Sequence, residues 1–156
     1  MAGSELFAEQ GAHAGKFVLE IDDRPIGWFT EVSGLEVEVE VETIEEGGEN
    51  SFVHKVPGRM KWPDLVFKRG LTQSDNLFEW LDGSAGAGLE AAGNTLKRST
   101  GAITLLSRAG KALRAWEIEG AFPVKWTGPT FASGSDDTAD EELRVAHHGF
   151  RPKTLG

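Results

Sequence analysis

The sequence contains no cysteine, which excludes a disulfide framework and any thiolate chemistry. It also has no apolar run that approaches the roughly 20 residues of a membrane-spanning helix. Residues 1–15, MAGSELFAEQGAHAG, have neither the basic start nor the apolar stretch of a secretion signal. We therefore expect a protein that is made and folded in the cytoplasm, and that leaves the cell only by lysis or through a dedicated machine.

Positive charge is scarce as well. The 156 residues include 25 acidic and 16 basic side chains, for a net charge of −9. This balance argues against a general binder of nucleic acid or of anionic membranes. The length suits one domain that buries a core without covalent staples. We expect residues 1–15 to form a flexible or partner-ordered tail and residues 16–156 to form that single domain.

The sequence shows no complete catalytic or metal-binding pattern. It has no Walker loop and no G-x-S-x-G elbow, and a loose G-x-G-x-x-A at residues 86–91 follows a predicted helix rather than a strand. His147 and His148 are neighbours in a predicted strand, so they point to opposite faces, and His54 has no ligand partner at metal spacing. We therefore expect a protein that is not an enzyme and has no metal or cofactor.

Short strands dominate the predicted secondary structure. Apolar alternation and turn residues predict strands at 16–21, 26–33, 35–44, 51–56, 64–69, 97–107, 111–119, 121–126 and 141–148. One short helix follows Ser74 as N-cap and ends at Gly83, and Pro57-Gly58 predicts a turn. The pattern predicts a mainly β fold, a small barrel or sandwich of about seven to nine strands with one short α-helix. Most of the five tryptophans are expected in the core, with Trp62 exposed at a protein interface.

Charge and hydrophobicity alternate regularly in residues 35–50, LEVEVEVETIEEGGEN. In a strand, Val37, Val39 and Val41 share one face, which we expect to pack on the subunit core, and the opposite face carries Glu36, Glu38, Glu40 and Glu42. Residues 31–50 have eight acids and no Lys or Arg, whereas residues 54–70 have five bases and one acid. These two segments are either strands of one hairpin that neutralise each other or complementary surfaces between copies of the chain.

Several stretches occur together in a characteristic order. They are IGWFTEVSGLEVEVE, EEGGENSFVHKVPGRMKWPDLVFKRG, AFPVKWTGPTF and EELRVAHHG, and the most specific parts are E-G-G-x-N, P-G-R before K-R-G, and P-V-K-W-x-G-P. The chain resembles the tail tube proteins of contractile phage tails and contractile injection systems from about Phe17 to Gly149. The glycine-rich stretch 83–95 does not match the family pattern.

This resemblance implies a structural subunit that forms six-fold rings, stacked into a hollow tube inside a contractile sheath. The implied partners are other copies, sheath subunits, baseplate or spike proteins, terminator proteins, and cargo in the lumen, either phage DNA or an effector protein. The implied location is a phage tail or injection particle assembled from protein made in the bacterial cytoplasm, with no membrane binding by the chain itself. The alternative is a secreted, ring-forming effector carrier of the type VI secretion class, whose haemolysin-coregulated proteins have a similar fold.

Two candidate surfaces follow for such a tube. Four uncompensated carboxylates need water or bases, so Glu36, Glu38, Glu40 and Glu42 are candidates for lining the lumen, with an ordinary outer face paired to Lys or Arg as the alternative. Residues 45–62 combine turn formers with exposed apolar residues, which predicts an extended inter-subunit loop rather than a regular hairpin arm. The candidate contacts are Gly47, Gly48, Asn50, Phe52, Lys55, Pro57, Gly58, Arg59, Lys61 and Trp62. The alternative is that this segment folds back over its own core.

Overall fold

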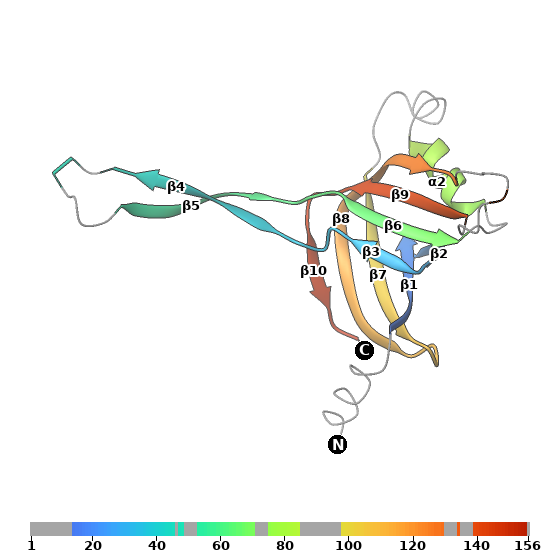
Figure 1. The fold of residues 1–156 in the computed structure, drawn as a ribbon. Helices are drawn as coiled ribbons and strands as arrows, with labels where there is room; N and C mark the ends of the chain where they lie inside the picture. Colours follow the sequence, from blue (N-terminus) through green and yellow to red (C-terminus); the bar gives the residue numbers. More distant parts are fainter. Residues whose placement is uncertain are drawn as a thin grey trace, which may run out of the picture.

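The computed structural model describes residues 14–45, 47–48, 53–70, 75–84, 98–129, 134 and 139–155. Figure 1 shows a barrel of strands and, projecting sideways from it, a long two-stranded arm. The elements are β1 (Ala14–Ile21), β2 (Arg24–Phe29), β3 (Glu31–Ser33), β4 (Glu38–Ile44), β5 (His54–Lys61), β6 (Leu65–Gly70), α2 (Asn76–Ser84), β7 (Ser99–Ser107), β8 (Ala112–Thr127), β9 (Asp140–Ala146) and β10 (Phe150–Lys153).

The barrel is built around the long strand β8. The strand order is β2-β1-β7-β8-β9-β6-β3, and β10 also pairs with β8. The first half of β8 lies between β7 and β10, and its second half pairs with β9. The two end strands of this order are β2, which pairs with β1, and β3, which pairs with β6. They follow each other directly in the chain. Between them the Thr30 N–H donates to the Lys68 carbonyl at 2.9 Å, so one bent segment joins the two edges.

The core fills the interior of this barrel. Alternation along the strands directs apolar side chains inward, and the rings of Phe29 and Phe67 meet with centroids 5.1 Å apart. Helix α2 adds the buried Leu77. At the margin, the ring of the half-buried Trp126 lies 4.6 Å from that of Phe78. The fully buried large side chains are Leu19, Phe29, Leu65, Phe67, Leu77, Ile103, Ile118, Leu143 and Val145.

A buried ion pair lies within this apolar interior. The Arg69 Nε donates to the Glu141 carboxylate at 2.7 Å, and the guanidinium lies 5.2 Å from the centre of the Phe29 ring. Gly27 leaves the room that the guanidinium needs, because a Cβ at this position would collide with an Arg69 nitrogen. The pair connects β6 with β9, and its contacts reach β2.

The structure confirms the predicted mainly β class with a short helix, and it corrects several details. Helix α2 continues through Gly83 to Ser84, whereas the sequence predicted a stop at Gly83. The predicted strands 111–119 and 121–126 are one strand, because Gly120 adopts a φ of 62° without interrupting β8. Strand β10 was not predicted, since four residues that include Pro152 give too short a signal.

The tryptophans follow the core prediction only in part. Trp80, Trp116 and Trp126 are partly buried against the core. Trp28 is wrongly predicted, because 54% of its side-chain surface is exposed on the outer face of β2, and Trp62 is half-buried rather than exposed. The Trp28 correction concerns which face of a strand a residue occupies, which local hydrophobicity alone did not determine.

Candidate functional site

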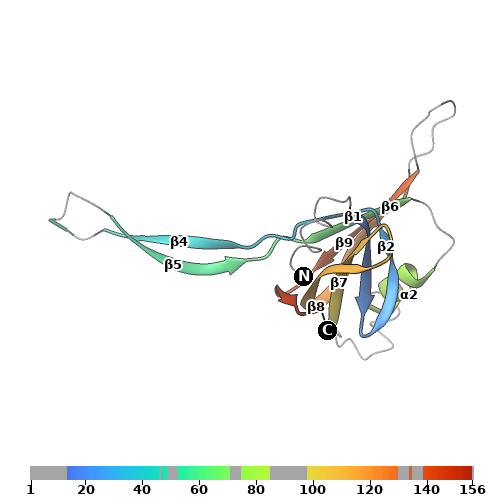
Figure 2. The same cartoon turned by 90° about the horizontal axis from the view of Figure 1, so that it is seen from below.

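The arm is formed by β4 and β5, which pair only with each other among the described strands. Figures 1 and 2 show it extending away from the barrel, with no other described strand or helix beside it. The register sets Glu38 opposite Lys61 and Val39 opposite Met60. Residues 54–61 therefore form a hairpin strand, although a bulged one, so the prediction of a loop in place of a hairpin arm is wrong for these residues.

The turn formers of β5 are accommodated by an irregular register. Val39 pairs with Met60, but Val41 pairs with Pro57, so β5 carries one more residue than β4 in this interval. Pro57 and Gly58 lie inside this bulged region rather than in a turn. A Cβ on Gly58 would lie 3.2 Å from the Glu40 carbonyl, so glycine allows the two strands to approach here.

The arm has one apolar face. Residues that pair across the hairpin lie on the same face, which places Val39, Val41, Pro57 and Met60 together. The exposed fractions are 43% for Val39, 60% for Val41 and 54% for Met60. The prediction that the valine face packs on the subunit's own core is therefore wrong, because the hairpin carries this face beyond the barrel.

The opposite face of the arm is acidic. Glu38, Glu40 and Glu42 alternate with the valines, and Glu40 accepts an ion pair from Lys61 at 2.7 Å. The pKa of Lys61 is raised above its ordinary value of 10.5, first by the hydrogen bond that its ammonium donates to Glu40 and then by the charge of that carboxylate. The hypothesis of two hairpin strands that neutralise each other is thus confirmed at this pair. Whether the acidic face lines a lumen or joins copies stays a prediction.

Two contacts fix the arm where it leaves the barrel. Before β4, Gly34 adopts a φ of 88°, and a Cβ there would collide with the Asp64 carbonyl. After β5, the Trp62 ring packs edge-on against Phe150 at 5.1 Å and close to the backbone of Gly149. Trp62 thus contacts its own subunit, in line with the alternative reading in which the segment folds back on its own core.

His147 also lies at this junction, with its ring beside that of Trp62. Its Nε2 lies 2.8 Å from the Pro63 carbonyl, and its Nδ1 accepts the Gly149 N–H at 3.0 Å. Both ring nitrogens are therefore within hydrogen-bond distance of backbone groups. His147 is buried and His148 is exposed, but β9 ends at Ala146, so the prediction that both lie in a strand over residues 141–148 is wrong.

The remaining predicted contact residues divide into three groups. Lys55 and Arg59 are exposed on β5, and Gly47 and Gly48 lie in a turn beyond β4. Glu36 is exposed before β4. Asn50 and Phe52 lie outside the described residues. The register thus brings Lys55 and Arg59 onto the same hairpin as the glutamates, which sequence spacing alone left open.

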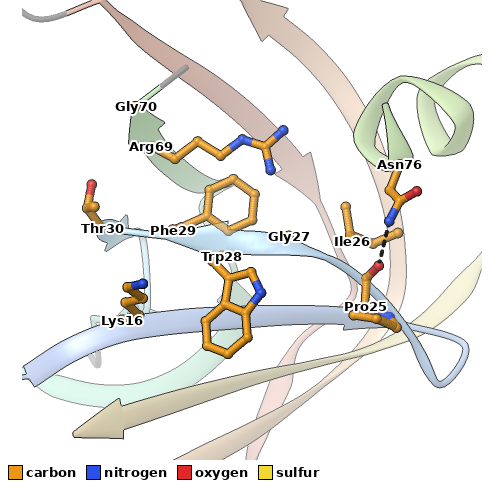
Figure 3. Close-up of a pocket in the computed structure, with 10 residues that line it drawn as sticks. All are labelled: Lys16, Pro25, Ile26, Gly27, Trp28, Phe29, Thr30, Arg69, Gly70 and Asn76. Carbon is orange, nitrogen blue, oxygen red and sulfur yellow. Dashed lines mark hydrogen bonds between the residues drawn. The ribbon is translucent and has the colours of Figure 1, made fainter. Parts of the chain in front are cut away.

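A pocket of about 440 Å³ lies against β2 and was not predicted. Figure 3 shows Trp28 and Lys16 on one side of β2, with the Lys16 ammonium 5.6 Å from the Trp28 ring, and Arg69 above Phe29 on the other. Asn76 donates to the Pro25 carbonyl at 3.4 Å and closes one end. The lining contains no carboxylate, histidine or hydroxyl pair with which to build a catalytic group.

Other chemical features are limited within the described part of the chain. No group of three His, Asp or Glu side chains there is arranged to hold a metal ion. None of its helices has the length and apolarity to cross a membrane. The described part of the chain is thus a strongly curved sheet with a projecting, two-faced arm.

The family follows from the sequence comparison. A family model described as the T4-like virus tail tube protein gp19 matches residues 13–151. The chain therefore belongs to this family of tail tube proteins and is a structural tube subunit, which confirms the resemblance found in the sequence. No curated protein sequence matches the chain.

Solved structures from contractile injection and secretion systems have a similar fold. A chain of the PVC sheath–tube complex, an extracellular contractile injection system in its extended state, is similar over 99% of both chains with a TM-score of 0.76 and 24% identity. A chain of the anti-feeding prophage tube-terminating cap is similar over 92% of this chain and 91% of its own, with a TM-score of 0.72 and 22% identity. A type six secretion system protein is similar over 88% and 82%, with a TM-score of 0.53 and 11% identity.

Proposed function

We propose that the chain forms six-fold rings that stack into the inner tube of a contractile phage tail or injection particle, with the arm joining each copy to another. The exposed apolar face of the arm carries this proposal. An isolated two-stranded hairpin is marginally stable in water and needs further strands or a packing surface. Val39, Val41 and Met60 are covered by no other part of the described chain. In a tube made of copies, the covering surface belongs to the next copy.

The proposed tube also has partners outside itself. The similar chains come from a sheath–tube complex, a tube-terminating cap and a baseplate. We propose corresponding contacts for this chain, with sheath subunits around the tube and with terminator and baseplate proteins at its two ends. The lumen conducts phage DNA or an effector protein. The particle acts outside the cell that made it, and the subunit itself performs no catalysis.

The secreted ring-forming carrier is the weaker alternative. The fold likeness to the type six secretion protein has a TM-score of 0.53, against 0.76 for the injection-system tube chain. The family model that matches most of the chain is that of a phage tail tube. No feature of the barrel or arm favours an isolated ring over a stacked tube.

The apolar face of the arm provides the test. The double substitution Val41→Ser with Met60→Ser removes apolar area that only an assembly would bury, so the barrel should keep its melting temperature while tubes are lost. Electron microscopy and light scattering after size exclusion measure assembly, and circular dichroism measures folding. Val124→Ser is the matched control, since Val124 is also exposed but lies on β8 of the barrel. A double variant that builds normal tubes would show that the arm does not join copies.

A further inference from the structure

The pocket against β2 follows the unpaired edge of that strand. Strand β2 ends the strand order, and among the described strands it pairs only with β1. Every residue from Pro25 to Thr30 lines the pocket. One face of a strand offers only alternate residues, so a pocket that touches consecutive residues runs along the edge. Figure 3 shows Trp28 on one side of this edge, and Phe29 with Arg69 on the other.

Two hydrogen bonds close the ends of this edge. At one end the Thr30 N–H donates to the Lys68 carbonyl at 2.9 Å, and at the other the Asn76 side chain donates to the Pro25 carbonyl at 3.4 Å. Apart from β1, no described element forms a hydrogen bond with the backbone between them. Residues 26–29 thus leave about 13 Å of strand edge that pairs with nothing in the described chain.

This edge lacks the features that protect free strands in soluble proteins. Exposed edges are commonly blocked by charged side chains or by proline within the strand. Residues 26–30, IGWFT, contain neither. Trp28 instead leaves 54% of its surface exposed beside the edge, and tryptophan is enriched where proteins meet. The edge is therefore suited to pairing with a further strand.

The charged side chains along the pocket are positive. Its described lining includes Lys16 and Arg69 but no Asp or Glu. The Lys16 ammonium lies over the Trp28 ring and forms no ion pair with a described residue. Arg69 shares its charge with Glu141 through Nε, while its Nη1 lies against Gly27 at the pocket. A segment that carries carboxylates is therefore favoured over a basic one.

We propose that the free edge of β2 binds an extended, acidic segment of a partner protein, which adds to the sheet as a further strand. In this mode of recognition main-chain hydrogen bonds supply affinity, and contacts with alternate side chains supply selectivity. Lys16 and the Nη nitrogens of Arg69 attract the carboxylates, and Trp28 packs on the apolar side chains between them. Glu31 and Asp75 adjoin the ends of the pocket in the sequence, but neither lines it.

Peptide binding tests the proposal without depending on the proposed tube. The probes are two labelled, end-capped hexapeptides, one of alternating Glu and Val and one of alternating Lys and Val, and fluorescence anisotropy measures their binding. The chain is the Val41→Ser, Met60→Ser variant, which should stay dispersed. We expect saturable binding of the acidic peptide, and binding of the basic peptide that is weaker by roughly tenfold or more. Equal binding of both, or binding of neither, would overturn the proposal. Tubes built by this variant would count against the joining role of the arm, which is a separate result.

Selective N-methylation of the acidic peptide tests strand pairing. A strand directs alternate N–H groups to its two edges, so methylation of the valine nitrogens blocks one edge and methylation of the glutamate nitrogens blocks the other. One of these two peptides should lose affinity by roughly tenfold or more, because its blocked edge must face β2. The other should bind like the parent peptide. Equal affinity of the two, whether retained or lost, would show that the segment does not pair as a strand.

Charge reversal on the chain locates the site. Lys16→Glu should weaken binding of the acidic peptide by roughly tenfold, because a carboxylate then faces the carboxylates of the peptide. Lys125→Glu is the matched control, since Lys125 is an exposed cation of β8 that does not line the pocket. The control should bind like the parent chain. Equal weakening in both variants would reduce the effect to net charge and overturn the proposal.

A second copy of the chain is the competing occupant of the edge. Sedimentation velocity of the same dispersed variant, with and without the acidic peptide, separates the two. We expect a monomer in both conditions. A dimer that the peptide dissociates would assign the edge to another copy and overturn the acidic partner.

Discussion

The barrel and the arm use the same strand geometry with opposite results. In the barrel, strands β6 and β9 bury Leu65, Phe67, Leu143 and Val145 on their inner face. In the arm, β4 and β5 alternate just as regularly, yet no described element covers either face. The comparison shows that alternation predicts a strand with one apolar and one polar face. It does not predict what covers the apolar face. Substitutions in the two regions should therefore separate folding from assembly.

The largest effect is expected at the barrel core. Phe67→Ala removes a fully buried ring that packs on Phe29, and should lower the free energy of unfolding by about 3–5 kcal/mol. Chemical denaturation measures this loss. Met60→Ala on the arm is the comparison and should leave stability unchanged while weakening assembly. A core substitution without loss of stability would contradict the placement of Phe67.

Breaking the buried ion pair should have a similar or slightly smaller effect. Arg69→Met leaves the Glu141 carboxylate buried without its partner, which costs about 3–5 kcal/mol in comparable cases. Arg151→Met is the control, because its ion pair with Glu119 is long, at 3.8 Å, and exposed. The control should stay within about 0.5 kcal/mol of the wild type. Equal stability of the two variants would show that the Arg69 pair is not needed in the core.

The junction between barrel and arm should show an intermediate effect. Gly34→Ala places a Cβ against the Asp64 backbone at a φ of 88°, and should cost about 1–3 kcal/mol. Because Gly34 precedes β4, a shift there redirects the arm, so tube yield should fall more than stability. Gly70→Ala is the control, since a Cβ there meets nothing within 4 Å. If assembly falls only in proportion to stability, the junction does not set the direction of the arm.

The smallest effect is expected at the exposed Lys61–Glu40 pair. The raised pKa of Lys61 means that the pair stabilises the arm fully below pH 10.5 and loses this contribution as the pH rises through the higher folded-state pKa. Lys61→Met should leave global unfolding unchanged and speed amide hydrogen exchange only in β4 and β5. Protection equal to that of the wild type at pH 8 would show that the pair adds nothing.

The sequence predicted the barrel better than the arm. Alternation and turn residues were enough for the β class, since strands such as β6 and β9 are apolar on one face and are buried there. The arm failed on two points. Pro57 and Gly58 normally end a strand, but a bulged register with open solvent on both sides tolerates them. The exposure of Val39 and Val41 could not be decided locally, because it depends on whether the rest of the fold reaches this face.

The candidate site was predicted residue by residue but not in its arrangement. Glu38 and Lys61 were both singled out, and the fold places them opposite each other. The buried Arg69–Glu141 pair escaped prediction because its members are 72 residues apart in the sequence. Only strand pairing brings them together, and pairing between distant segments is the part of a fold that local sequence determines least.

In the proposed tube, the unsupported arm would also govern when assembly begins. A free subunit holds its arm as a marginal two-stranded ribbon, so the first contact between copies must supply the free energy of ordering it. A ring that is already built presents ordered arms, and each later subunit then meets a prepared surface at lower cost. Tube growth should accordingly show a lag that a pre-formed ring removes. In the proposed tube, subunits would therefore stay dispersed until a first ring exists.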